Sequence, residues 1–160
     1  MKTVMRFGQL GIVLMMAAYY LLVAFNNVLD YGTNFNYVKH VMSMDSIAFD
    51  PHVAWHAMTS PALHHLGYVG IIVWEAAAGI LCGVGAVRMG LRFRAEEFRG
   101  AKAWALAGLW LGAFLWGLAF ITVGGEWFMM WESVVWNGEM PAFRMFTVNG
   151  IALLLVYLGE

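Results

Sequence analysis

Cysteine is almost absent from the sequence, and Cys82, the single thiol, lies inside an apolar run. One thiol cannot form an internal disulfide, which excludes the disulfide-exchanging four-helix membrane enzymes. The CxxC pairs of structural zinc sites are missing, as are the phosphate-binding loop, the dinucleotide fingerprint and the nucleophile elbow. No motif therefore assigns a reaction, and a non-enzymatic role is favoured.

Charge is also scarce, because charged residues make up 12% of the 160-residue chain, against about 25% in ordinary soluble domains. The net charge of -1 offers no basic footprint for nucleic acid. Hydrophobic residues make up 62%, which is more apolar surface than a soluble core of this size can bury. The composition predicts a single integral membrane domain that has lipid as its main partner.

Four apolar runs are long enough to be transmembrane helices, which need about 20 residues to cross the hydrocarbon of a bilayer. They cover residues 7–25, 66–87, 103–123 and 142–158. Glu75 interrupts the second run, the third is expected to end at Gly124-Gly125, and the fourth carries Arg144 and Asn149. Small residues four apart, as in Gly79/Gly83 and Gly108/Gly112, favour close packing between these helices. We predict an all-α, four-helix transmembrane bundle.

Lysine and arginine are unequally divided between the two sides of this bundle. Seven of them fall before the first run or around the connection between the second and third: Lys2, Arg6, Arg88, Arg92, Arg94, Arg99 and Lys102. Lys39 and Arg144 fall on the other side. Because cytoplasmic loops carry the excess of basic residues, both termini are predicted to be cytoplasmic, in the cell inner membrane. Residues 27–65 and 124–141 then form a periplasmic cap.

The cap is predicted to contain short helices. Asp50-Pro51 and Ser60-Pro61 each resemble an N-cap followed by proline at the first helical position, so helices are expected over 51–58 and from Pro61 into the second run. Asp30 or Thr33 can cap another over 34–43. The tryptophan-rich segment 126–136 has apolar residues at helical spacing, which predicts an interfacial helix across the bundle.

Glu75 is the most informative single residue, because it lies about 13 Å below the outer end of the second run at 1.5 Å per residue. A carboxylate there costs about 2.5–3.5 kcal/mol on insertion scales. It is either a proton or cation site or a partner for a bound quinone, or else a neutral glutamate bonded to a neighbouring helix. Tyr68 and His64 share its helix face, and Glu126 is expected to reach the same group.

All five histidines lie on the predicted outer side. His52 and His56 are four residues apart, the spacing that lets two imidazoles share a metal, and His64 is a candidate third ligand. Imidazole and carboxylate ligands together suit a transition metal such as zinc, copper or iron. Exposed or helix-capping histidines are the plainer interpretation of the same residues.

Several segments resemble the DUF2165 family of small integral membrane proteins. The resemblance rests on Glu75 and on Tyr31–Phe35 (YGTNF), His40–Asp45 (HVMSMD), Gly124–Ser133 (GGEWFMMWES), Trp136–Gly138 (WNG) and Ala142–Arg144 (AFR). It implies a four-span bacterial inner-membrane protein, and it brings no known activity, substrate or cofactor.

Three functions stay open at this point. The first is a non-catalytic accessory or binding subunit whose cap docks a membrane-protein partner, and the small size and missing motifs favour it. The second is a metal- or quinone-binding subunit of a redox enzyme that uses the outer histidines and Glu75. The third is a proton- or cation-coupled transporter acting as a homo-oligomer, although the sequence lacks the paired broken spans of such proteins.

Overall fold

The computed structural model describes residues 1–158, in which four helices are long and apolar enough to cross a membrane. They are α1 (Lys2–Leu29), α3 (Pro61–Leu91), the continuous segment Phe98–Trp127 and α6 (Glu139–Leu158). Each contains one of the predicted apolar runs, so the prediction of an all-α protein with four spans is confirmed.

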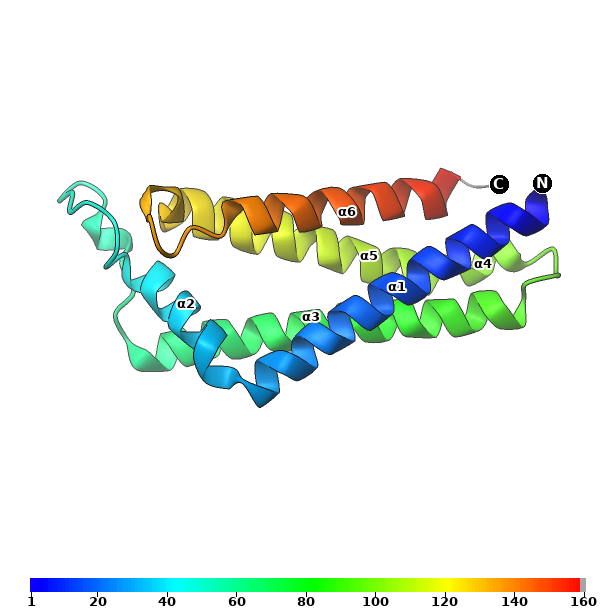
Figure 1. Ribbon diagram of the computed structural model, residues 1–160, viewed down its shortest axis with the longest axis horizontal. Helices are drawn as coiled ribbons and strands as arrows, with labels where there is room; N and C mark the ends of the chain where they lie inside the picture. The colour runs from blue at the N-terminus through cyan, green and yellow to red at the C-terminus, as the bar shows by residue number, and fades with distance from the viewer. Residues whose placement is uncertain (159–160) are drawn as a thin grey trace.

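The described chain has two distinct ends (Figure 1). The start of α1, the end of α6 and the connection between the second and third spans lie together at one end, called the basic end here because it holds the seven basic residues named above. The opposite end, the cap end, contains residues 30–60 and 128–138. Successive spanning helices therefore run antiparallel, because each of the three connections joins two helices at the same end.

The outward faces of the four long helices are apolar. In the most apolar 18-residue stretch of each helix, only 28–33% of the residues are buried inside the protein. Large side chains such as Leu22, Val73, Trp110 and Leu154 are more than half exposed. Exposing so much apolar surface to water would be unfavourable, and it occurs on all four long helices. These surfaces are therefore suited to contact lipid.

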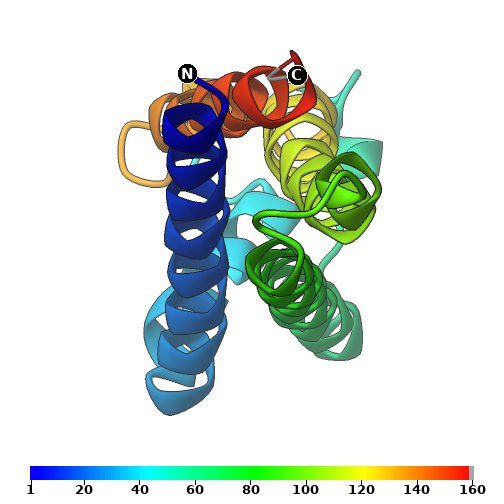
Figure 2. The same cartoon turned by 90° about the vertical axis from the view of Figure 1, so that its right-hand side faces the viewer.

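Helix α3 lies at the centre of the packing and contacts both α1 and the third span, whereas α6 packs mainly on the third span (Figure 2). A Cβ atom added at Gly79 would approach Leu21 of α1 to 2.8 Å, and one at Gly108 would approach Cys82 Sγ to 2.6 Å. Small residues therefore allow close approach of the helices, as predicted. Gly83 is the exception, because its Cβ position faces open space.

The third span consists of α4 (Phe98–Ala101), α5 (Ala103–Phe114) and η2 (Leu115–Trp127), the last of which is a wide π-helix. The backbone N–H of Phe128 donates to the carbonyl of Val123 at 3.0 Å, five residues back. The expectation that this span ends at Gly124-Gly125 was wrong. Both glycines are buried inside the helix, where their Cβ positions lie against Met130 Sδ and Glu139 Oε1.

In the first cap segment, α2 (Tyr31–Ser43) confirms the predicted helix and starts three residues earlier than expected. The predicted helix over 51–58 is wrong, because only the 3₁₀ turn η1 (Ala54–His56) forms there. The reason is a contact with a distant segment: the backbone N–H of Met58 bonds to the carbonyl of Met42 at 2.7 Å instead of continuing a helix. The start of α3 at Pro61 is as predicted.

The predicted interfacial helix over 126–136 is also wrong. Helix η2 continues to Trp127, Met129 adopts a left-handed backbone with φ of 52°, and a single 3₁₀ turn, η3 (Met130–Glu132), follows. The left-handed residue reverses the chain direction and ends the helical hydrogen-bond pattern. Trp136 therefore packs against Tyr37 and His40 of α2, whereas Trp127 packs against Trp55 and His56 of η1.

Candidate functional site

Glu75 lies at the buried end of a chain of hydrogen bonds that joins three helices. Its side chain is 2% exposed, and its Oε2 accepts a hydrogen bond of 2.7 Å from Asn27 Nδ2 of α1. Asn27 Oδ1 in turn accepts a 2.6 Å bond from Asn34 Nδ2 of α2. A buried polar group needs such partners, because leaving it unpaired costs about 1–3 kcal/mol. The chain therefore ties the cap helix α2 to two spanning helices.

Of the residues predicted to join Glu75, only Tyr68 shares its neighbour. Tyr68 Oη donates to the backbone carbonyl of Asn27 at 3.2 Å. His64 is buried but has other partners, since its Nε2 donates to the carbonyl of Met58 at 2.6 Å and lies 3.3 Å from Ser43 Oγ. Glu126 is exposed on η2 and borders a different cavity.

The histidines are distributed over the cap end. His56 stacks on the ring of Trp127 with centroids 4.3 Å apart, and its Nδ1 lies 2.8 Å from the carbonyl of that residue. His52 lies in the turn before η1, so that the two are not on one continuous helix. Within residues 1–158, no group of three His, Cys, Asp or Glu side chains is placed to hold a metal ion.

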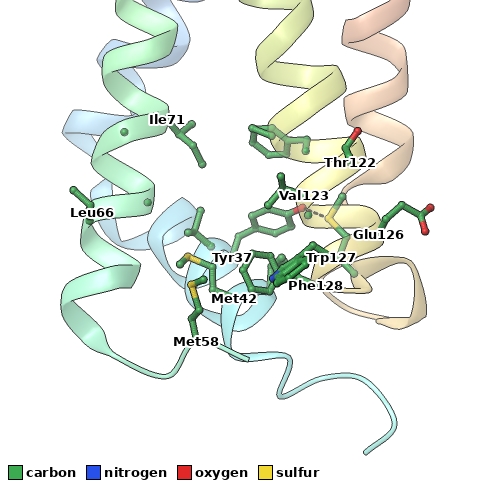
Figure 3. A pocket seen from close by; sticks show the side chains of 18 of the residues that line it. Tyr37, Met42, Met58, Leu66, Ile71, Thr122, Val123, Glu126, Trp127 and Phe128 are labelled. Atoms are coloured by element: carbon green, nitrogen blue, oxygen red, sulfur yellow. Dashed lines mark hydrogen bonds between the residues drawn. The ribbon is translucent and has the colours of Figure 1, made fainter. Parts of the chain in front are cut away.

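A cavity of about 810 Å³ lies between α2, α3 and η2 at the cap end (Figure 3). Its walls are almost entirely apolar. They include Val38, Val41, Met42, Met58, Leu66, Gly67, Gly70, Ile71, Trp74, Phe120, Val123, Trp127, Phe128 and Met130. Ligand cavities in proteins have volumes of about 300–1,000 Å³, so this one is large enough for an organic molecule.

The few polar groups on the cavity wall already have partners. Tyr37 Oη donates to Met130 Sδ at 3.0 Å, and Trp74 Nε1 donates to the carbonyl of Leu111 at 3.0 Å. Burial, with a smaller contribution from Glu139, raises the pKa of Tyr37 to about 12, so this phenol is neutral at physiological pH. The carboxylate of Glu126 points away from the other labelled side chains (Figure 3). The cavity thus offers contacts to hydrocarbon and no charge.

The mouth of the cavity faces the side of the bundle. Leu66 and Gly70 on α3 and Thr122 and Val123 on η2 line the cavity and are also exposed at the protein surface. Both walls belong to helices that can span a membrane. An opening between two such helices is suited to admit a hydrocarbon chain from a bilayer.

The comparisons with known proteins agree with this architecture. The family model described as predicted small integral membrane protein (DUF2165) matches residues 5–159. The chain belongs to the DUF2165 family. No curated protein and no solved structure matches it. Membership in DUF2165 confirms the resemblance found in the sequence and describes an integral membrane protein, with no activity attached.

Sequence reasoning missed two features of this DUF2165 chain. Asn27 was not singled out, although its side chain bonds directly to Glu75, which is 48 positions away. The cavity was missed because its wall combines α2, α3 and η2 with Met58, which precedes α3, and with Phe128 and Met130, which follow η2. The predicted runs gave no signal for the first feature, because they placed Asn27 in the cap and Glu75 well inside the second span.

Proposed function

We propose that this chain is a non-catalytic membrane protein that binds an extended hydrocarbon chain in the cap-end cavity. The acyl chain of a phospholipid and the isoprenoid tail of a quinone share this chemistry. The observation that carries the proposal is the apolar cavity of about 810 Å³ with its mouth between α3 and η2. A binding subunit of this kind needs no catalytic motif.

The composition of the wall supports a flexible, uncharged ligand. Met42, Met58 and Met130 line the cavity, and methionine side chains adapt their shape to different apolar partners. Trp74 and Trp127 add broad, rigid surfaces. A polar ligand would lose its hydration without gaining new hydrogen bonds, because the indole of Trp74 and the phenol of Tyr37 already have partners.

Filling the cavity is expected to displace this ligand. A Cβ atom at Gly70 meets nothing within 4 Å, and Gly70 lies on the cavity wall, so the ring in Gly70→Phe can enter the cavity without a backbone clash. We expect the variant, purified in mild detergent, to retain several-fold less phospholipid or quinone per chain than the natural protein. Native mass spectrometry of the intact complex measures the ligand retained per chain. Separate additions of phospholipid and decylubiquinone show whether the bound hydrocarbon chain belongs to a lipid or to a quinone.

Gly83→Phe is the matched control. Gly83 is on the same helix, its Cβ position is equally open, and it does not line the cavity. The control should retain as much ligand as the natural chain. Equal retention by Gly70→Phe and the natural protein, or no bound chain in either, would contradict the proposal.

We further propose that the cap end is periplasmic and the basic end cytoplasmic, in the cell inner membrane. The seven basic residues of the basic end support this orientation, because basic loops are retained on the cytoplasmic side. Only Lys39 and Arg144 are at or near the cap end.

Cysteine labelling in intact cells tests the orientation. In a Cys82→Ser background, Lys39→Cys is expected to react with a membrane-impermeant maleimide, whereas Arg94→Cys is expected to react only after the cells are permeabilised. Both positions are exposed, so that access to the reagent depends on the side of the membrane. Labelling of Arg94→Cys in intact cells would reverse the proposed topology.

A further inference from the structure

A second cavity, of about 540 Å³, lies at the basic end between the start of α1 and the connection that follows α3. Its wall consists of Lys2, Thr3, Arg6, Phe93, Arg94, Ala95 and Glu96. Three of these residues are cationic and one is acidic. In the sequence, these basic residues indicated only which side of the membrane the chain termini occupy. Their arrangement around one cavity is a property of the fold.

Arg6 holds the two sides of this cavity together. Its Nη1 donates to the carbonyl of Phe93 at 2.8 Å and to that of Ala95 at 2.9 Å. The guanidinium also lies over the ring of the fully buried Phe98, 4.6 Å from its centroid. These contacts fix the connection against the first turn of α1. Lys2 and Arg94 thereby line the same cavity from two different segments.

The chemistry of Lys2 and Arg94 matches a phosphate group. A guanidinium presents paired N–H donors to two phosphate oxygens, and an ammonium adds a compact positive charge. Both side chains are exposed, so a ligand can reach them. Glu96 is also exposed at the cavity and reduces the local positive charge without cancelling it.

The position of the cavity identifies where the phosphate comes from. Lys2 begins the first spanning helix, and Arg94 follows the end of the second by three residues. Helix ends of this kind lie at the level of lipid headgroups, and basic pockets between spanning helices on the cytoplasmic side bind anionic headgroups. We propose that Lys2 and Arg94 bind the phosphate group of an anionic lipid at the basic end. This site is at the opposite end from the hydrocarbon-binding cavity and does not depend on it.

The test compares two double variants that remove the same number of positive charges. Lys2→Gln with Arg94→Gln removes both proposed ligands. Lys39→Gln with Arg92→Gln removes two exposed basic residues that do not line the cavity, one of them only two positions from Arg94. The affinity of the purified chain for phosphatidylglycerol is measured by native mass spectrometry. We expect a loss of about thirtyfold in the first variant, since each of the two basic residues contributes about 1 kcal/mol near the surface and about 1.4 kcal/mol corresponds to tenfold.

The control variant should keep its affinity within about twofold of the natural chain. Equal losses in both variants would show a diffuse charge effect and overturn the site. Phosphatidylcholine carries a phosphate too, but its choline ammonium cancels the net charge, so it should bind the natural chain and both variants alike. Inorganic phosphate is added as a competitor in a separate arm. If millimolar phosphate alone displaces the lipid completely, the site recognises a free anion, and the assignment to a lipid headgroup fails.

Discussion

Gly85→Leu is expected to disrupt the bundle more than leucine at any other glycine of α3. A Cβ atom at this position would lie against the backbone N, the Cα and the Cβ of Ala105 on α5. No side-chain rotamer relieves a contact with backbone, so the two helices must separate. Overpacking of a tight core costs about 1–3 kcal/mol and occasionally more. For a chain of this size, we expect the Tm in detergent to fall by roughly 5–10 °C.

Gly83→Leu provides the comparison, because Gly83 is two residues away and its Cβ position meets nothing within 4 Å. Both variants add the same side chain and the same helix propensity to one helix. Circular dichroism during heating should show a much smaller change for Gly83→Leu. Similar Tm values for the two variants would mean that α3 and α5 do not pack through Gly85.

The spanning helices were predictable because the bilayer imposes one simple requirement. A segment such as residues 66–87 must supply about 20 apolar residues in a row, whatever its neighbours are. That property is local to each run, so the sequence alone locates α1, α3, the third span and α6. Their exact ends were less predictable, since Trp127 rather than Gly124 ends the third span.

The cap was less predictable because its turns depend on contacts between distant segments. The 51–58 segment has a sound N-cap and proline signal, yet the hydrogen bond from Met58 to Met42 draws the chain away from a helix. Met129 adopts a left-handed backbone without being glycine or asparagine, so its residue type gives no warning. Tertiary packing determined both outcomes.

The candidate sites were predictable only as single residues. The sequence singled out Glu75, because an acid in an apolar run is costly, and Tyr68, because it shares the helix face of Glu75; both side chains are buried. The partners of these two residues were not predictable. Helical spacing shows which residues share one face of a helix, but it does not show which residues of another helix pack against that face. The apolar cavity was not predictable either, because the residues of its wall are of the same types as ordinary core residues and come from several elements.

Glu75→Leu is expected to release α2 from the spanning helices. Leucine leaves Asn27 Nδ2 buried without its acceptor, and Asn34 then bonds to an amide that is no longer held in place. The cost of the unpaired donor is about 1–3 kcal/mol, which should lower the Tm by several degrees. A spin label at Gly32→Cys, in a Cys82→Ser background, should then become more mobile, because α2 has lost its hydrogen-bonded connection to the spanning helices. Gly32 suits the label, since it is an exposed position near the start of α2.

Glu75→Gln distinguishes a structural hydrogen bond from a site that needs a titratable carboxyl. The amide oxygen of glutamine can accept the same bond from Asn27 Nδ2, so the Tm and the label mobility should stay close to those of the natural chain. The partners seen here favour this outcome, because two asparagine amides donate in sequence and neither readily passes a proton along. If Glu75→Gln instead loosens α2 as much as Glu75→Leu, the negative charge itself holds the network together. A proton- or cation-binding role for Glu75 would then be the better explanation.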